Sequence, residues 1–134
     1  MQLTKLVKSV EFVSWDKCTA TWVDGSTVYV PGSVEWEKIN VKPFPTLKIS
    51  DKIESKQRIW TAELEFYTPD TISCQKPLIW RICLTNGKFM LIGDGNRPYP
   101  ILAFTDSLPD SPTENQLLAV KVTLNSVKKI PYIR

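Results

Sequence analysis

The chain of 134 residues contains no histidine. Histidine is the commonest general base in enzymes and a frequent zinc ligand, and it activates the nucleophile in Ser–His and Cys–His pairs. Its absence therefore excludes the usual nucleophilic hydrolases and most zinc sites. Only carboxylates and thiols remain as candidate catalytic groups.

Two candidates for such chemistry are present, and neither is favoured. Glu63 and Glu65 occupy alternate positions of a predicted strand, so both carboxylates face one side, with Cα atoms about 7 Å apart. Such a pair can cleave a glycosidic bond, but alternating glutamates also mark the solvent face of a sheet. Cys74 has only Lys76 nearby in the sequence to activate its thiol. We therefore expect no enzymatic activity.

Cysteine and glycine are scarce. The three cysteines, Cys18, Cys74 and Cys83, are odd in number and form no Cys-x-x-Cys spacing, so neither a disulfide framework nor a zinc site is expected. The five glycines supply no phosphate-binding loop and no nucleotide fingerprint. Residues 94–96 (Asp-Gly-Asn) look like a fragment of a calcium loop without the remaining ligands, which makes a plain turn the better interpretation. No cofactor and no metal ion are expected.

Long apolar runs and basic clusters are also missing. No stretch approaches the roughly 18 apolar residues of a membrane span, and residues 1–13 lack the apolar core of a signal peptide. If Met1 is the native start, we expect a protein that is made and kept in the cytoplasm, away from membranes. The net charge of +3 comes from 17 scattered basic and 14 acidic residues, and the longest basic run is Lys128-Lys129. Nucleic-acid binding is therefore not expected.

What the sequence does contain is alternation of apolar and polar residues. In the clearest strand, 58–68, the even-numbered residues from Trp60 to Phe66 share an apolar face, and the odd-numbered residues from Thr61 to Tyr67 share the other. Eight to ten such strands, spaced by about 8–12 residues, predict a single domain over residues 1–134. Its fold class is all-β, a single antiparallel β-sandwich or β-barrel.

The other predicted strands have weaker patterns. They cover residues 7–15, 17–23, 27–30, 33–41, 78–84, 89–93, 101–105 and 118–124, with a possible edge at 130–133. The segment 47–54 is ambiguous. Loops are expected at 69–77 and 106–116, and the length of the second favours a functional role.

Two hairpins are predicted from their turn residues. Asp24-Gly25 and Asn86-Gly87 each separate two β-rich runs, and both dipeptides favour a type I′ turn, which needs positive φ at both central positions. The strands around Asn86-Gly87 are apolar on both faces. We therefore expect the hairpin of residues 78–95 to lie at the centre of the sheet, covered on both sides.

The candidate interaction surface combines a loop and a tryptophan. Arg97, Pro98 and Tyr99 lie in a loop that two prolines stiffen, and Arg and Tyr are favoured at interface hot spots. Alternatively, Tyr99 caps the sheet and Arg97 pairs with a carboxylate. Trp36 lies between two glutamates in a weak strand, which makes it the best candidate for an exposed ring, although partial burial is the commoner outcome.

The remaining tryptophans fit other roles. Trp22 and Trp60 are in phase with apolar neighbours of their strands, so both are expected in the core. Five tryptophans is nevertheless a high count for a domain of this size. An exposed one would provide a flat surface for a sugar or a protein partner.

One resemblance to a known group of proteins rests on the order of several segments. These are Arg-Ile-Trp-Thr-Ala-Glu-Leu at 58–64, Leu-Ile-Gly at 91–93, Arg-Pro-Tyr-Pro at 97–100, Asn-Gln-Leu at 115–117 and Lys-Ile-Pro-Tyr-Ile at 129–133. In this order they resemble small uncharacterised proteins of phages and prophages of Bacteroides-type bacteria, encoded among head, neck and tail genes. The resemblance covers about the C-terminal two thirds of the chain. It implies a β-rich virion or tail-associated protein that works by assembly, and it supplies no catalytic residues to carry over.

Two functions follow from these observations. The first is a structural protein, a head–tail or tail-associated component that joins protein partners or further copies of itself into a ring or tube, and so resides in the virion. Virion β-domains assemble by extending sheets or by docking loops. The alternative is a carbohydrate-binding β-sandwich module that uses an exposed tryptophan such as Trp36.

Overall fold

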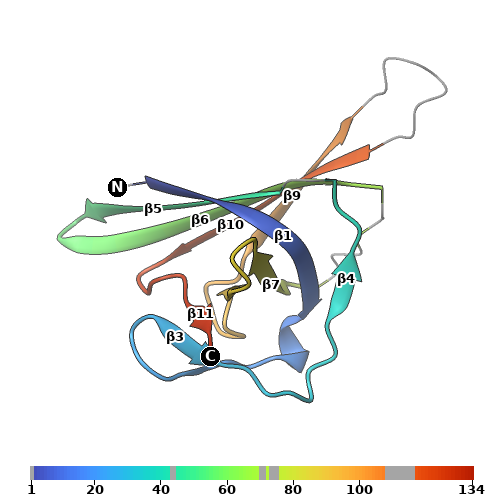
Figure 1. Cartoon of the computed structure of the whole chain (residues 1–134). Helices are drawn as coiled ribbons and strands as arrows, with labels where there is room; N and C mark the ends of the chain where they lie inside the picture. Colours follow the sequence, from blue (N-terminus) through green and yellow to red (C-terminus); the bar gives the residue numbers. More distant parts are fainter. Residues whose placement is uncertain (1, 43–44, 70–71, 73–75, 108–116) are drawn as a thin grey trace.

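The structure is a computed structural model that describes residues 2–42, 45–69, 72, 76–107 and 117–134 (Figure 1). These residues form eleven strands and one short 3-10 helix, η1 (Trp15–Lys17). The strands are β1 (Gln2–Ser14), β2 (Thr21–Trp22), β3 (Thr27–Tyr29), β4 (Glu37–Ile39), β5 (Thr46–Glu54), β6 (Gln57–Thr68), β7 (Leu78–Leu84), β8 (Phe89–Ile92), β9 (Ile101–Ser107), β10 (Leu117–Ser126) and β11 (Tyr132–Ile133). The predicted all-β class is confirmed. Within these residues there is no helix long and apolar enough to cross a membrane.

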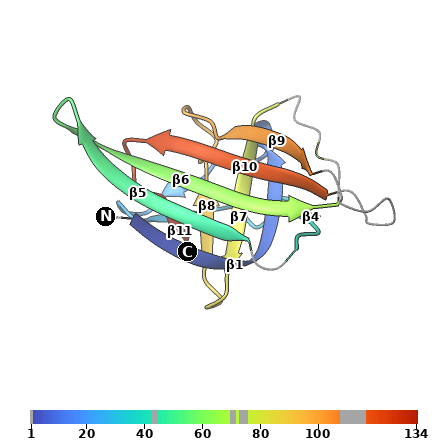
Figure 2. The ribbon, with the colours of Figure 1, turned by 90° about the horizontal axis from the view of Figure 1, so that it is seen from above.

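The strands form a single open sheet that folds back on itself. Its order is β2-β3-β11-β8-β7-β1-β5-β6-β10-β9, with β4 paired to β1, and only β3 and β11 pair in parallel. The long strand β1 joins the two halves. Its first residues, up to Leu6, pair with β5, and after an irregularity between Val7 and Ser9 the rest pairs with β7. In Figure 2, β5, β6 and β10 run crosswise over β7.

We call the two parts the first half-sheet (the start of β1 with β5, β6, β10 and β9) and the second half-sheet (the rest of β1 with β4, β7, β8, β11, β3 and β2). Their facing sides enclose the main core. Trp80 on β7 is the largest fully buried side chain. Its ring centroid lies 5.6 Å from that of Phe12 and 5.9 Å from that of Phe66, so one tryptophan connects both halves.

A second, smaller core lies on the opposite face of β7 and β8. Ile79 and Leu91 point into it, and there they meet Val13, Cys18 and Val28, all buried. Five of the seven residues of β7 are therefore buried. The predicted central position of the β7–β8 hairpin, with cover on both sides, is confirmed.

Both predicted hairpins exist, but neither has the predicted type I′ turn. In the turn between β7 and β8, only Gly87 has positive φ (87°), and Leu84 exchanges backbone hydrogen bonds with Gly87 and Lys88. This is the three-residue loop, a type I turn followed by a glycine in the left-handed region. At Asp24-Gly25 neither φ is positive, because the Asp24 carboxylate accepts a hydrogen bond from the backbone N–H of Ser26 and forms an Asx turn instead.

Other boundaries differ from expectation in instructive ways. The ambiguous segment 47–54 belongs to the nine-residue strand β5, because β1 and β6 pair with it on both sides. Of the predicted strand 33–41, only β4 forms. The predicted loop 106–116 begins later, since β9 continues to Ser107. Residues 108–116 and Cys74 lie outside the described residues.

Candidate binding groove

The loop that follows β8 is fixed against the segment before β2. Gly95 has φ of 92°, and a Cβ at this position would lie 2.4 Å from the Cys18 carbonyl oxygen, so no other residue fits without displacing the backbone. One residue earlier, the Asp94 carbonyl accepts a hydrogen bond from Ala20 N–H over 3.0 Å. The residues that follow in this loop are therefore held at a defined place.

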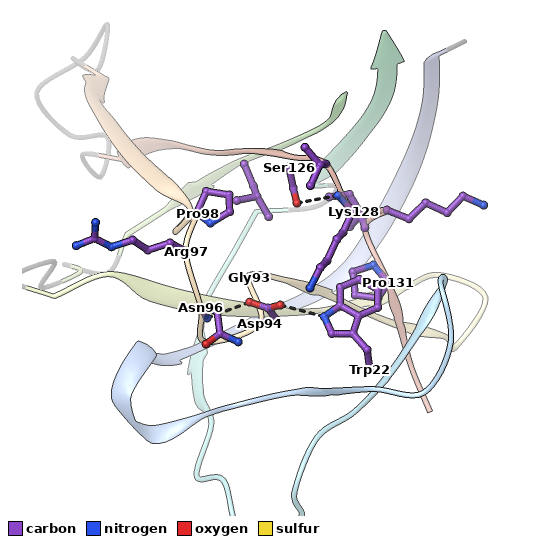
Figure 3. Close-up of a pocket in the computed structure, with 13 residues that line it drawn as sticks. Trp22, Gly93, Asp94, Asn96, Arg97, Pro98, Ser126, Lys128 and Pro131 are labelled. Atoms are coloured by element: carbon purple, nitrogen blue, oxygen red, sulfur yellow. Dashed lines mark hydrogen bonds between the residues drawn. The ribbon is translucent and has the colours of Figure 1, made fainter. Parts of the chain in front are cut away.

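The Asp94 side chain ties this loop to β2. Its Oδ2 accepts a hydrogen bond from Trp22 Nε1 over 2.9 Å, and its Oδ1 accepts one from Asn96 N–H over 3.0 Å (Figure 3). Both carboxylate oxygens thus have donors. The bond to Nε1 also fixes the orientation of the Trp22 ring.

A cavity of about 100 Å³ opens beside these residues. Asp94, Arg97 and Pro98 line one side, Trp22 lies at the bottom, and the segment 126–131 between β10 and β11 lines the other (Figure 3). A wider hollow of about 490 Å³ shares Trp22, Val127, Lys128 and Lys129 with this cavity and adds Trp60. The two hollows therefore adjoin along these four residues, and we call them together the Trp22–Trp60 groove.

Two lysines lie over the two tryptophans of the groove. Lys128 Nζ is 5.3 Å from the centre of the Trp22 ring, and Lys129 Nζ is 5.5 Å from that of Trp60. Arg58 also lies 6.0 Å from the Trp60 ring. These are cation–π distances. Among the ion pairs of the described residues, none includes Lys128 or Lys129.

The expectation that Trp22 and Trp60 belong to the core is only partly right. Both are half-buried, Trp22 against the second core and Trp60 against the main core. Each lies at the rim of its cluster and lines a hollow together with Val127, Lys128 and Lys129 of the segment 126–131. The period-2 pattern identifies which face of a strand points inward, but it does not show which of the inward-facing side chains are covered by other segments.

The predicted loop residues are separated by the fold. Arg97 and Pro98 are exposed and line the groove, whereas Tyr99 is half-buried and packs on Trp15, with ring centroids 5.5 Å apart. The loop therefore presents Arg97 and Pro98 outward and uses Tyr99 to cover the second half-sheet.

Trp36 lies in a different environment. It is half-buried against the second core, and the Arg81 guanidinium lies 4.8 Å from its ring. That guanidinium also donates two hydrogen bonds to the Glu11 carboxylate, over 3.2 and 2.7 Å. Since Arg81 lies against its ring and the second core against its side, Trp36 is not the open platform that its neighbours in the sequence suggest.

The other residues that could take part in catalysis lie in different environments. Lys121 Nζ lies 3.8 Å from carboxylate oxygens of both Glu63 and Glu65, so this half-buried pair shares one cation. Burial raises the pKa of the Cys18 thiol, an effect that the positive charge of Arg81 opposes. No group of three or more potential metal ligands occurs among the described residues.

Comparison with known proteins adds no relative. The chain matches no protein-family model, and no curated protein or solved structure matches it. Sequence patterns indicate the groove residues only in part. Lys128-Lys129 is the longest basic run of the chain, and tryptophan is its most over-represented aromatic residue. Nothing in the sequence places these residues side by side.

Proposed function

We propose that this chain is a non-enzymatic structural protein that assembles with further copies of itself, as a head–tail or tail-associated component of a phage or prophage. The assembly part of the proposal rests on one observation, the edge of the sheet at β9, which among the described residues pairs on one side only. The phage part rests on the resemblance of residues 58–64, 91–93, 97–100, 115–117 and 129–133.

Strand β9 is an edge with an apolar outer side. Among the described residues it pairs with β10 alone. Leu102 packs on the main core, so Ile101 and Ala103 point to the opposite face, where Ile101 is 66% exposed. Natural edge strands are usually protected by lysine, proline or a bulge. The β9 sequence, Ile-Leu-Ala-Phe-Thr-Asp-Ser, has no lysine and no proline, and Asp106 is its one charged residue.

The face beside this edge is suited to a partner. A shallow hollow of about 180 Å³ lies over Ala103 and Ala119, where two small side chains leave space between larger ones. Tyr67, 53% exposed, stands at its rim. A strand added to β9 can place its side chains in this hollow while its backbone continues the sheet, which is the usual geometry of β-strand addition.

The proposal is tested by the self-association of the purified chain. We expect light scattering to show oligomers whose mass rises with concentration, and negative-stain images to show rings or tubes. Ile101→Lys places a charge on the edge and should weaken self-association by about tenfold or more. Ile53→Lys is the matched control, because Ile53 is 71% exposed at the far end of the β5–β6 hairpin.

Two results would contradict the assembly proposal: a strict monomer at millimolar concentration, or equal loss of association in both variants. The phage assignment has a separate test. Portal, capsid or tail genes beside the gene for this chain are expected, and a neighbourhood of unrelated metabolic genes would contradict that assignment.

The alternative of a carbohydrate-binding module requires an indole ring with access to solvent. Trp36 lines none of the hollows described above, and the Arg81 guanidinium over its ring is already paired with Glu11. The rings that border a hollow are those of Trp22 and Trp60.

A further inference from the structure

We propose that the Trp22–Trp60 groove binds an acidic saccharide, whose rings stack on the indoles and whose carboxylates pair with Lys128 and Lys129. This site is independent of the β9 edge and of the assembly proposed above. Four observations carry the inference: two fixed indoles, two lysines without carboxylate partners, exposed polar side chains along the groove, and acidic residues that disfavour a polyphosphate.

The two indole rings are held in place before any ligand arrives. Trp22 donates its Nε1 hydrogen to Asp94, and its ring packs on the second core. Trp60 lies in the strand β6, whose backbone is paired on both sides, and its side chain packs against the main core. Because neither ring has to be ordered on binding, the groove loses little entropy when a flat ligand stacks on it.

The lysines decide the charge of the ligand. A sugar ring that stacks on Trp22 or Trp60 must move the ammonium group that lies over that indole. A neutral sugar offers this cation nothing in exchange. A carboxylate at the edge of the sugar pairs with the displaced ammonium, so both the ring and the cation keep a partner. An acidic sugar is therefore favoured over a neutral one.

The acidic side chains of the groove decide between a saccharide and a nucleic acid. Asp94 lines the first hollow and Asp24 the second. A phosphate backbone that follows the groove would approach both carboxylates, whereas sugar hydroxyls donate hydrogen bonds to such groups. Asn96 and Arg97, both exposed, provide further donors along the first hollow. The mixed charges fit a ligand that has more hydroxyls than carboxylates.

The binding experiment uses a short oligogalacturonide as the acidic probe, the matching neutral oligogalactoside and a single-stranded oligothymidylate. The signals are the indole N–H peaks in ¹H–¹⁵N spectra, which report on each tryptophan separately. We expect the oligogalacturonide to shift the Trp22 and Trp60 peaks saturably, and the other two probes to bind at least about tenfold more weakly.

Variants of the lysines separate the proposed contact from general attraction. Replacing both lysines, with Lys128→Gln and Lys129→Gln, should lower the affinity for the oligogalacturonide about tenfold and abolish the preference over the neutral probe. Lys52→Gln with Lys56→Gln, at exposed positions of the β5–β6 hairpin, removes the same charge and should change neither. Trp60→Phe should keep the fold and weaken binding of the acidic probe.

Three outcomes would overturn the proposal. They are the absence of a saturable shift at Trp22 and Trp60, equal binding of the acidic and neutral probes, and tighter binding of the oligothymidylate. The last outcome would assign the groove to nucleic acid. Equal loss of affinity in the groove variant and the hairpin variant would also contradict it, because net charge alone would then explain the binding.

Discussion

Strands β6 and β7 belong to the same sheet, but they are covered in different ways. In β6, buried residues such as Leu64 alternate with half-buried ones such as Glu63, and only one face meets the core. In β7 the consecutive residues Ile79 and Trp80 are both buried, one in each core. The additional cover comes from the segment between β1 and β4, which includes η1, β2 and β3 and packs on the outer face of β7 and β8. Irregular chain with few paired strands thus completes the burial of the central strand.

The charges of the two strands follow this difference. The guanidinium of Arg81 on β7 donates two hydrogen bonds to the carboxylate of Glu11, a residue that is 6% exposed. The β6 carboxylates Glu63 and Glu65 share Lys121 at 3.8 Å on an exposed face. A charge on a covered face needs a close partner, because burial removes its hydration. A charge on a face that is open to solvent is stabilised by water and needs no such partner.

The largest expected effect is the loss of core side chains from both faces of β7. Trp80→Ala should lower the free energy of unfolding by about 4 kcal/mol, and Ile79→Ala by about 3 kcal/mol, because each leaves a cavity in its own core. Chemical denaturation monitored by circular dichroism measures both. A nearly neutral Ile79→Ala would show that the second core is loosely packed and contributes little.

The next effect concerns the buried ion pair. Arg81→Ala should cost about 3 kcal/mol, because it leaves the Glu11 carboxylate buried without its partner and removes the cation beside Trp36. Replacing both residues, with Glu11→Leu and Arg81→Leu, should recover most of this loss, since no charge is then buried. Denaturation of the two variants side by side is the measurement. No recovery in the double variant would mean that packing of the Arg81 stem on Trp36 dominates.

A smaller effect is expected on the wet face of β6. Glu63→Ala and Lys121→Ala should each change the free energy of unfolding by about 0.5 kcal/mol or less. The adjacent residue gives the matched comparison, because Leu64→Ala, in the main core, should cost about 3 kcal/mol. A loss of stability clearly above about 1 kcal/mol for Glu63→Ala would contradict the expectation that this face of β6 is open to solvent.

The smallest effect leaves stability unchanged and compares two thiols. Burial in the second core raises the pKa of the Cys18 thiol, so little reactive thiolate forms there, whereas Cys83 on β7 is half-buried. In a Cys74→Ser background at pH 8, iodoacetamide should modify Cys83 about tenfold faster than Cys18, as followed by mass spectrometry. Equal rates in the folded protein would contradict the tight cover of the second core.

The sequence predicted the strands best where hydrophobic alternation is regular. The faces of residues 58–68 and the central position of the β7–β8 hairpin are as expected, because period-2 alternation and doubly apolar runs report directly on burial. Turn type was predicted less well. Asp24 and Asn86 each use a side-chain oxygen to bind a backbone N–H two residues on, which stabilises turns without the predicted positive φ at both positions.

From the sequence, the residues of the candidate site could be predicted only one by one, without their neighbours in the fold. Arg97 and Pro98 do line the groove, but Tyr99 turns to Trp15 and Trp36 to Arg81. The partners of these rings come from distant strands, and a local pattern carries no information about them. The same limit explains why the alternation pattern predicts core positions for Trp22 and Trp60.

The sequence by itself determined the all-β class, the inward faces of the long strands and the positions of the hairpins, because alternation and turn residues act over a few neighbours. Only the tertiary structure decided which side chains at the rims of the two cores remain accessible to solvent. It brought Lys128 and Lys129 over two tryptophans that lie 106 and 69 residues earlier in the chain, respectively. It also left β9 at the edge, because strand order depends on which distant strands pair, and those pairings follow from the burial of the whole sheet rather than from any single segment.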